Sequence, residues 1–271
     1  RFSSAYSEKT VHADFNYGKG KWAFVTSASY FDFGDLKMGK NKGQASYLRS
    51  SFVERLNGID QEIPNSNPRK QIGTAYKQAN LMQKISFKPS EGSTIDYAFH
   101  YSSTGNIPRY DRLIEKRDGK LRFARWDYGP QRWMMQQVNW KTTNPTKIYD
   151  QAKITAASQY FEESRIDRRV GNATQFERIE KVQASSLNAD FIKNLFKSHF
   201  LNYGFEAVIN QVDSRGQAIN ISNQQVTDAS ARYPNSSWTS WAVYANYAAP
   251  LSPKLKMQSA LRYNINGINA D

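Results

Sequence analysis

Polar and apolar residues alternate along much of the chain with a period of two. From Ile95 to Tyr101 every odd position is aromatic or aliphatic, whereas Asp96, Ala98 and His100 occupy the even positions. The same alternation recurs in residues 10–17, 80–88, 201–210, 241–247 and 255–264. Because successive side chains of a β-strand point to opposite faces, this pattern predicts strands with one apolar and one polar face.

Connections of two kinds separate the predicted strands. Short turns rich in Gly, Asn and Pro are expected at residues 18–21, 90–93, 144–147, 194–199 and 250–254. Long polar connections are expected at residues 38–70, 103–131, 165–175 and 213–236. Short and long connections alternate, as they do between the strands of outer-membrane β-barrels.

The polar faces decide how such a sheet lies in a membrane. A Lys or Arg on the lipid face at the bilayer midplane costs about 2–4 kcal/mol, so the polar face must line the lumen. Aromatic residues a few positions from the short turns fit an interfacial girdle; they are Trp22, Phe87, Trp140, Phe191 and Tyr247. Several runs exceed ten residues, which disfavours a soluble β-sandwich, whose strands average about 5–6 residues.

The expected fold is an all-β, antiparallel transmembrane β-barrel with about ten strands in this chain. Unpaired strand edges do not occur in lipid, so ten strands either close into a small barrel or are joined by further strands. We favour the second arrangement. Residues 1–271 are then a partial β-barrel domain of a larger barrel, and its plug domain is not present in this sequence.

Composition narrows the possible functions. The net charge of +13 suggests a protein that binds nucleic acid. However, the basic residues are spread along the chain, and no helix-turn-helix, zinc-binding or RNP-like motif accompanies them. No run of about 20 apolar residues predicts a membrane helix. The chain has no cysteine. No catalytic motif and no metal-ligand spacing appear, so we expect neither an enzyme, nor a metal site, nor a cofactor.

Several strings are more specific than the alternation, namely residues 9–18 (KTVHADFNYG), 21–24 (KWAF), 33–39 (FGDLKMG), 107–113 (IPRYDRL), 123–131 (FARWDYGPQ) and 260–264 (ALRYN). They resemble TonB-dependent outer-membrane receptors, in particular the haemoglobin, siderophore and cobalamin receptor-like branch. The resemblance implies a 22-stranded barrel filled by an N-terminal plug, in the outer membrane of a Gram-negative bacterium. The chain would be the middle part of that barrel.

The resemblance also implies a function. Such a receptor captures an iron compound (a siderophore or haem) or another bulky nutrient, either free or on a carrier protein, and the TonB complex pulls the plug to admit it. Lipid and lipopolysaccharide would surround the barrel. Two alternatives remain open, a structural or interaction barrel of an envelope complex and a passive porin.

The connection at 105–132 is the strongest candidate for ligand binding. Its arginines and aromatic rings could hold an anionic, aromatic ligand by bidentate pairing and stacking. The candidate residues are Arg109, Tyr110, Arg112, Arg122, Arg125, Trp126 and Tyr128. The alternative is an Arg/Asp network that rigidifies the loop or contacts lipopolysaccharide phosphates.

Two histidines are candidate haem ligands. His12 and His100 both fall on the predicted lumen face, where an imidazole could ligate haem iron. The alternative is that each forms ordinary hydrogen bonds with its neighbours. The third, His199, lies at a short turn and is expected to be solvated.

Overall fold

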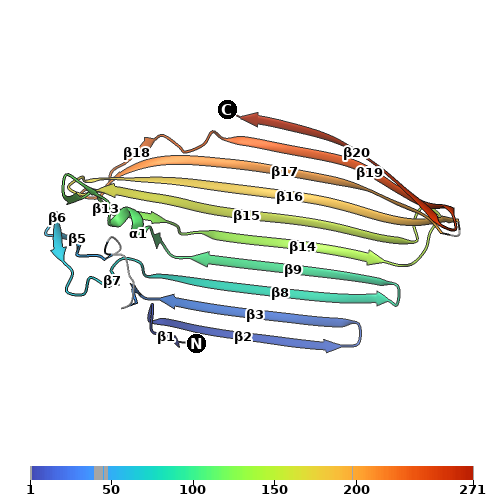
Figure 1. Cartoon of the computed structure of the whole chain (residues 1–271), viewed down its shortest axis with the longest axis horizontal. Coiled ribbons are helices and arrows are strands. Elements are labelled where there is room, and N and C mark those ends of the chain that lie inside the picture. The colour runs from blue at the N-terminus through green and yellow to red at the C-terminus, as the bar shows by residue number, and fades with distance from the viewer. Residues whose placement is uncertain (1, 40–44, 46–47, 197, 271) are drawn as a thin grey trace.

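The computed structural model describes residues 2–39, 45, 48–196 and 198–270. Within these ranges ten long strands form one antiparallel sheet, as the alternation predicts (Figure 1). They are β2 (Glu8–Lys19), β3 (Trp22–Phe33), β8 (Tyr76–Ser90), β9 (Ser93–Thr104), β14 (Arg132–Thr142), β15 (Gln151–Arg169), β16 (Thr174–Phe196), β17 (His199–Asn220), β19 (Ser236–Ser252) and β20 (Leu255–Ala270). Residues 40–44 and 46–47 of the expected connection 38–70, and residue 197 of the expected turn 194–199, lie outside the described residues.

The shorter elements gather at the end of the sheet opposite the short turns (Figure 1). They are β1 (Phe2–Ser3), β4 (Leu36–Lys37), β5 (Ser51–Leu56), β6 (Ile59–Pro64), β7 (Lys70–Gln71), β10 (Ile107–Pro108), α1 (Tyr110–Leu113), β11 (Lys116–Arg117), β12 (Lys120–Leu121), β13 (Phe123–Tyr128) and β18 (Val226–Ala229). In the described part of the chain, no helix has the length and apolar character that crossing a membrane requires.

The strand register joins the apolar faces into one surface. Residues directly opposite each other share a face, and one such row runs from β3 to β16 through Phe24, Ile85, Tyr97, Val138, Ala156 and Leu187. The neighbouring row of the other face is polar or small throughout. It runs from β8 to β16 through Lys84, Ala98, Gln137, Ala157 and Ser186. The predicted division into an apolar and a polar face therefore holds across the sheet.

Charged residues mark where the apolar face ends. On β2, Lys9 and Lys19 share the face of Val11 and Phe15, and nine residues, 10–18, separate them. About 9–11 residues of a tilted strand cross a bilayer, so the apolar segment has the required length. At the loop end, charged residues continue across the same face; they are Asp32, Lys77, Arg132, Glu162, Lys181 and Asp213.

The aromatic girdle lies where the sequence places it. Trp22 and Phe87 are directly opposite each other, and their ring centroids are 4.3 Å apart. Phe191 stacks on Tyr203 with a centroid distance of 5.2 Å. The expectation for His199 is wrong, because its Nδ1 lies 2.6 Å from the Tyr247 hydroxyl and the pair is partly buried. The histidine therefore belongs to the girdle.

Two expected connections are largely strand. Residues 165–175 were expected to form a long loop, but β15 continues to Arg169 and β16 begins at Thr174. Likewise β17 runs to Asn220 and β18 lies within 213–236. With 23 residues, β16 is about twice as long as a bilayer crossing needs. Alternation is lost in the projecting segments because both of their faces can meet water.

A tyrosine crosses one strand of the polar face to reach the next. The Tyr244 hydroxyl on β19 donates a hydrogen bond to the Asp190 carboxylate on β16, although β17 lies between the two strands. Gly204 is the β17 residue directly between them, and a Cβ at this position would overlap the tyrosine ring and the Ala189 carbonyl oxygen. Glycine is therefore required where the tyrosine crosses.

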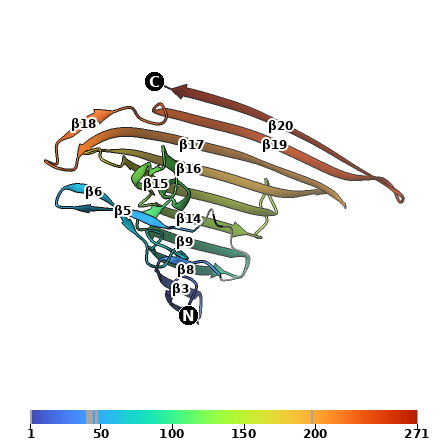
Figure 2. The same ribbon diagram turned by 60° about the vertical axis from the view of Figure 1, so that its left-hand side comes forward.

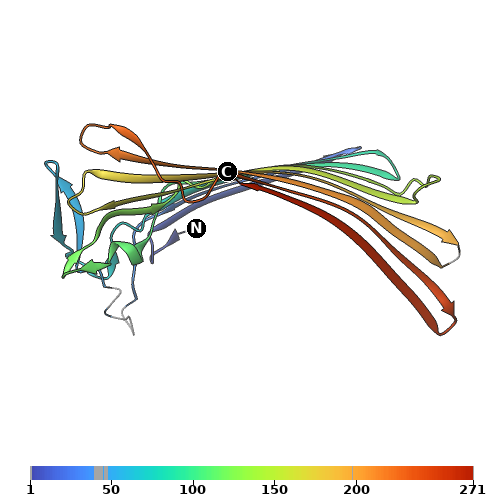
Figure 3. The same cartoon turned by 90° about the horizontal axis from the view of Figure 1, so that it is seen from above.

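The sheet curves along the strand order, which brings β19 and β20 out of the plane of the central strands (Figure 3). Its two edges are β1–β2 and β20, and no described pair joins these edges. Side chains of the polar face are mostly the less exposed ones, as in Gln137 and Asn139 compared with Gln136 and Val138. The fold is all-β, the antiparallel wall of a transmembrane β-barrel.

A charge on the outward face of β16 should be costly and one on the inward face should not. We expect Leu187→Arg to lower the free energy of unfolding from lipid vesicles by about 2–4 kcal/mol, which is a loss of stability. The adjacent inward residue provides the matched control, and Ser186→Arg should change stability by less than about 1 kcal/mol. Denaturant titration in vesicles measures both, and equal losses would contradict this assignment of the faces.

Candidate ligand-binding site at the loop end

The predicted binding loop folds against the inner side of the strand ends. β13 pairs with β15, which places Trp126 opposite Asp167 and Tyr128 opposite Arg165. These positions share the face of Gln159 and Phe161, which continues the polar face of the wall. Both rings therefore point into the mouth of the wall. A small buried cluster of Leu113, Phe123 and Trp126 holds the loop, with Tyr128 packed against it.

Arg109 is placed by both rings and by a carboxylate. Its guanidinium lies 4.8 Å from the centre of the Trp126 ring and 5.8 Å from that of Tyr128. The same guanidinium forms a two-point pair with Asp111, with Nε donating at 3.0 Å. This hydrogen-bonded pair holds the pKa of the Asp111 carboxyl below its ordinary value, against a smaller opposing effect of burial. Stacking and pairing together fix the plane of the guanidinium.

The other predicted arginines are also paired. Arg112 donates to Glu115 at 2.9 Å, and Arg122 donates to the second oxygen of the same carboxylate. Hydrogen bonds from Arg122 and then Arg112 lower the pKa of Glu115. Arg125 donates to Asp127 at 2.6 Å and to Gln175 of β16 at 2.9 Å. Burial raises the pKa of Asp127, and the Arg125 pair opposes this rise.

The structure thus gathers the predicted binding residues and neutralises much of their charge within the loop. Four arginines share three carboxylates, and between 33% and 41% of each arginine side chain remains exposed. Tyr110 contacts Arg49 of the preceding connection, with 5.8 Å from the ring centre to the guanidinium. This arrangement stiffens the loop and leaves part of each arginine side chain exposed. Ligand binding by these residues stays a prediction.

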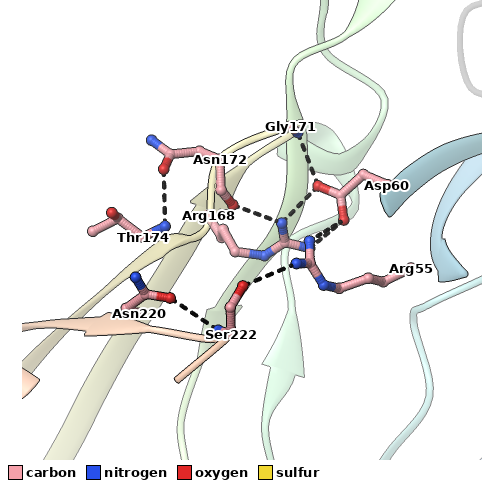
Figure 4. Close-up of polar contacts among 8 residues, drawn as sticks. All are labelled: Arg55, Asp60, Arg168, Gly171, Asn172, Thr174, Asn220 and Ser222. Carbon is pink, nitrogen blue, oxygen red and sulfur yellow. Dashed lines mark hydrogen bonds and ion pairs between the residues drawn. The ribbon is translucent and has the colours of Figure 1, made fainter. Parts of the chain in front are cut away.

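A clasp that the sequence did not indicate ties the β5–β6 hairpin to the strand ends. We call Asp60, Arg168, Arg55 and Gly171 the Asp60 clasp (Figure 4). Arg168 of β15 donates to both oxygens of Asp60, at 2.6 and 2.9 Å, and the Gly171 amide donates at 2.9 Å. Arg55 adds a contact of 3.2 Å and also reaches Ser222 in the turn before β18. The hairpin therefore spans the mouth toward β15–β18 (Figure 2).

The Asp60 clasp is buried and well paired. The Asp60 side chain has no exposed surface, and 8% of the Arg168 side chain is exposed. Burial alone would raise the pKa of Asp60, but the hydrogen bonds from Arg168, Gly171 and Arg55 outweigh it and lower the pKa. A carboxylate that accepts four such bonds needs no ligand to complete it. The clasp is a structural element that sets the position of the hairpin.

The two candidate haem ligands lie on the inner wall, on strands that are not neighbours. His12 on β2 lies 2.7 Å from the Ser29 hydroxyl and 3.4 Å from Asp14. His100 on β9 lies against Trp133, with 6.0 Å between ring centres. Three strand spacings, about 14 Å, separate their strands. In the ranges that the structure describes, no three His, Cys, Asp or Glu side chains gather closely enough to hold a metal ion.

Known proteins resemble this chain in structure only. No protein-family model matches it, and no curated protein matches it in sequence. The copper transporter OprC superposes with a TM-score of 0.60 at 9% identity, over 97% of this chain and 37% of that one. The FrpB iron transporter from Neisseria meningitidis (F3-3 variant) superposes with a TM-score of 0.63 at 12% sequence identity. That match covers 98% of this chain and 39% of the transporter. The likeness establishes the fold. This chain spans less than two fifths of either transporter.

Removing the central carboxylate should release the hairpin. We expect Asp60→Asn to lower the free energy of hairpin opening by about 3 kcal/mol, because a buried Arg168 then loses its ionic partner. Amide exchange in β5–β6 should become about a hundredfold faster. Glu54→Gln is the matched control, since Glu54 is exposed on the same hairpin. Unchanged exchange in the Asp60 variant would show that the clasp does not hold the hairpin.

Acid should open the same contact. A carboxyl whose pKa is lowered on folding stabilises the folded state above its unfolded pKa of about 3.9, and this stability is lost as pH falls through the lowered value. We therefore expect the hairpin to stay docked at about pH 5, to weaken below about pH 3.9 and to undock as the pH falls through the lowered pKa of Asp60. Spin labels on cysteines introduced at Asn57 and Asn223 would follow the distance, since the chain has no cysteine of its own. Undocking above pH 5 would exclude Asp60 as the titrating group.

Proposed function

We propose that this chain forms part of the wall of a TonB-dependent outer-membrane receptor that imports an iron compound or another bulky nutrient. The observation that carries the proposal is the combination of a lipid-facing wall with an arginine and aromatic loop turned into its mouth. The structural likeness to two outer-membrane transporters, one named for copper and one for iron, supports it. Location in the outer membrane of a Gram-negative bacterium, a plug and a TonB partner belong to the proposal.

The mechanism assigns each part of the wall a task. The outward face contacts lipid, and the charged residues above it meet the lipopolysaccharide layer. Arg109, Arg122 and Arg125 take the anionic groups of the ligand, while Trp126 and Tyr128 contact its apolar or aromatic surface. No bond is made or broken in the ligand. The plug, driven by the TonB complex, then opens the lumen.

The loop arginines allow a test that separates ligand binding from loop rigidity. Replacing Arg109, Arg122 and Arg125 by Ala should weaken capture of an anionic ligand at least about tenfold, because charge-assisted hydrogen bonds are lost. Replacing the partners instead, with Asp111→Asn and Glu115→Gln, frees the guanidinium groups and should preserve or increase capture. Arg117→Ala is the control, since 74% of its side chain is exposed. A purely structural network predicts equal losses from both sets of variants.

The measurement is uptake of labelled ferric siderophores and haemin by cells that carry or lack the protein. Uptake should require both the protein and TonB. Uptake that persists without TonB indicates the passive porin, and no protein-dependent uptake of any compound indicates the structural or interaction barrel. Haemin spectra that depend on His12 or His100 would identify haem as the ligand.

A further inference from the structure

The strand register brings two methionines to either side of His100. The chain has five methionines, and two of them lie on the polar face of the wall. Met82 on β8 is directly opposite His100 on β9, and Met135 on β14 is directly opposite the same histidine on its other side. The row Met82, His100, Met135 crosses three adjacent strands without interruption.

The spacing suits a common ligand. Side chains directly opposite each other in an antiparallel pair share a face and have Cβ atoms about 4.5–5.5 Å apart. Methionine has three flexible side-chain torsions, so both thioethers can bend toward the imidazole between them. All three side chains are half-buried. Met82 and His100 also line one groove of about 320 Å³ together with Trp133.

The imidazole is not committed to another polar group. Apart from the Trp133 ring, no polar contact of His100 with a described residue occurs, whereas His12 is held by Ser29 and Asp14. On the same face, Lys84 lies two positions from Met82 and Asp96 lies four positions from His100. Asp14 lies two strands from Met82 in the same row, beyond Ser27. Asp96 is paired with Lys141 at 3.8 Å. None of the three donors is a carboxylate.

We infer that Met82, His100 and Met135 form a binding site for a soft monovalent metal ion, Cu(I) or Ag(I), on the inner wall. Thioether sulfur is a soft ligand that selects Cu(I), and imidazole is compatible with it. Hard cations such as Mg²⁺ and Ca²⁺ need oxygen ligands, which this row lacks. The inference rests on the proposed function only in placing this face toward the lumen. It requires neither TonB nor a plug.

Silver provides a redox-inert probe for this site. The protein, purified in detergent with its methionine methyl groups labelled with ¹³C, is titrated with Ag(I) and, anaerobically, with Cu(I) against a chromophoric Cu(I) chelator. One equivalent should bind. The methyl signals of Met82 and Met135 should shift, and those of Met134 and Met257 should stay in place, because their side chains lie on the lipid face.

Substitutions then identify the ligands. Met82→Leu together with Met135→Leu conserves side-chain volume and should weaken binding at least about a hundredfold, as should His100→Ala. The matched control, Met134→Leu with Met257→Leu, should bind as the parent does, and circular dichroism verifies that each variant keeps its strands. Binding that is absent, or unaltered in the Met82 and Met135 variant, would overturn the inference.

The possible outcomes distinguish this soft-metal site from a haem site and from the transport proposal. A spectrum with haemin that needs His100, combined with no binding of Ag(I), would replace the soft-metal site by a haem site. If the protein binds Ag(I) but cells that carry it take up no more ligand than cells that lack it, the transport proposal alone is refuted. Intact uptake with no Ag(I) binding would refute this inference alone.

Discussion

Hydrocarbon offers no hydrogen-bond partner to a peptide group, and the architecture of this chain follows from that constraint. The long strands between the two edges of the sheet find their backbone partners in their neighbours, and every second side chain must then face lipid. The apolar row from Phe24 to Leu187 exists because the register leaves no alternative position for these residues. Charged side chains are confined to the lumen face or to the segments beyond the bilayer.

The same constraint explains which features the sequence predicts. Inside the bilayer the two faces meet different surroundings, so residues 94–102 alternate and their strand can be identified. Beyond the bilayer, both faces of β15 and β16 meet water and the alternation of polar and apolar residues disappears. Residues 165–175 were therefore predicted as a loop, although most of them are strand. Aromatic residues such as Trp22 and Phe87 were placed correctly because short turns fix their depth.

Contacts between distant segments escape this kind of prediction. The turn at residues 91–92 pairs Ser90 with Ser93, and only a register shift between Phe87 and Ser90 then places Met82 opposite His100. The partner on the other side lies beyond a connection of 27 residues, 105–131. No local signal sets the register across that connection. The Asp60 clasp is harder still, because Asp60 and Arg168 are 108 positions apart. The paired arginines of the binding loop could be anticipated in part, since Arg109 and Asp111 are near neighbours.

The length of that separation has a consequence for the order of folding. A contact between residues so far apart closes a large loop, and its entropy cost is recovered only when the intervening strands are already paired. The β5–β6 hairpin therefore docks last, onto a wall from β8 to β15 that is complete without it. Its release would leave the strand ladder untouched, so the mouth can rearrange on a lumen that keeps its shape.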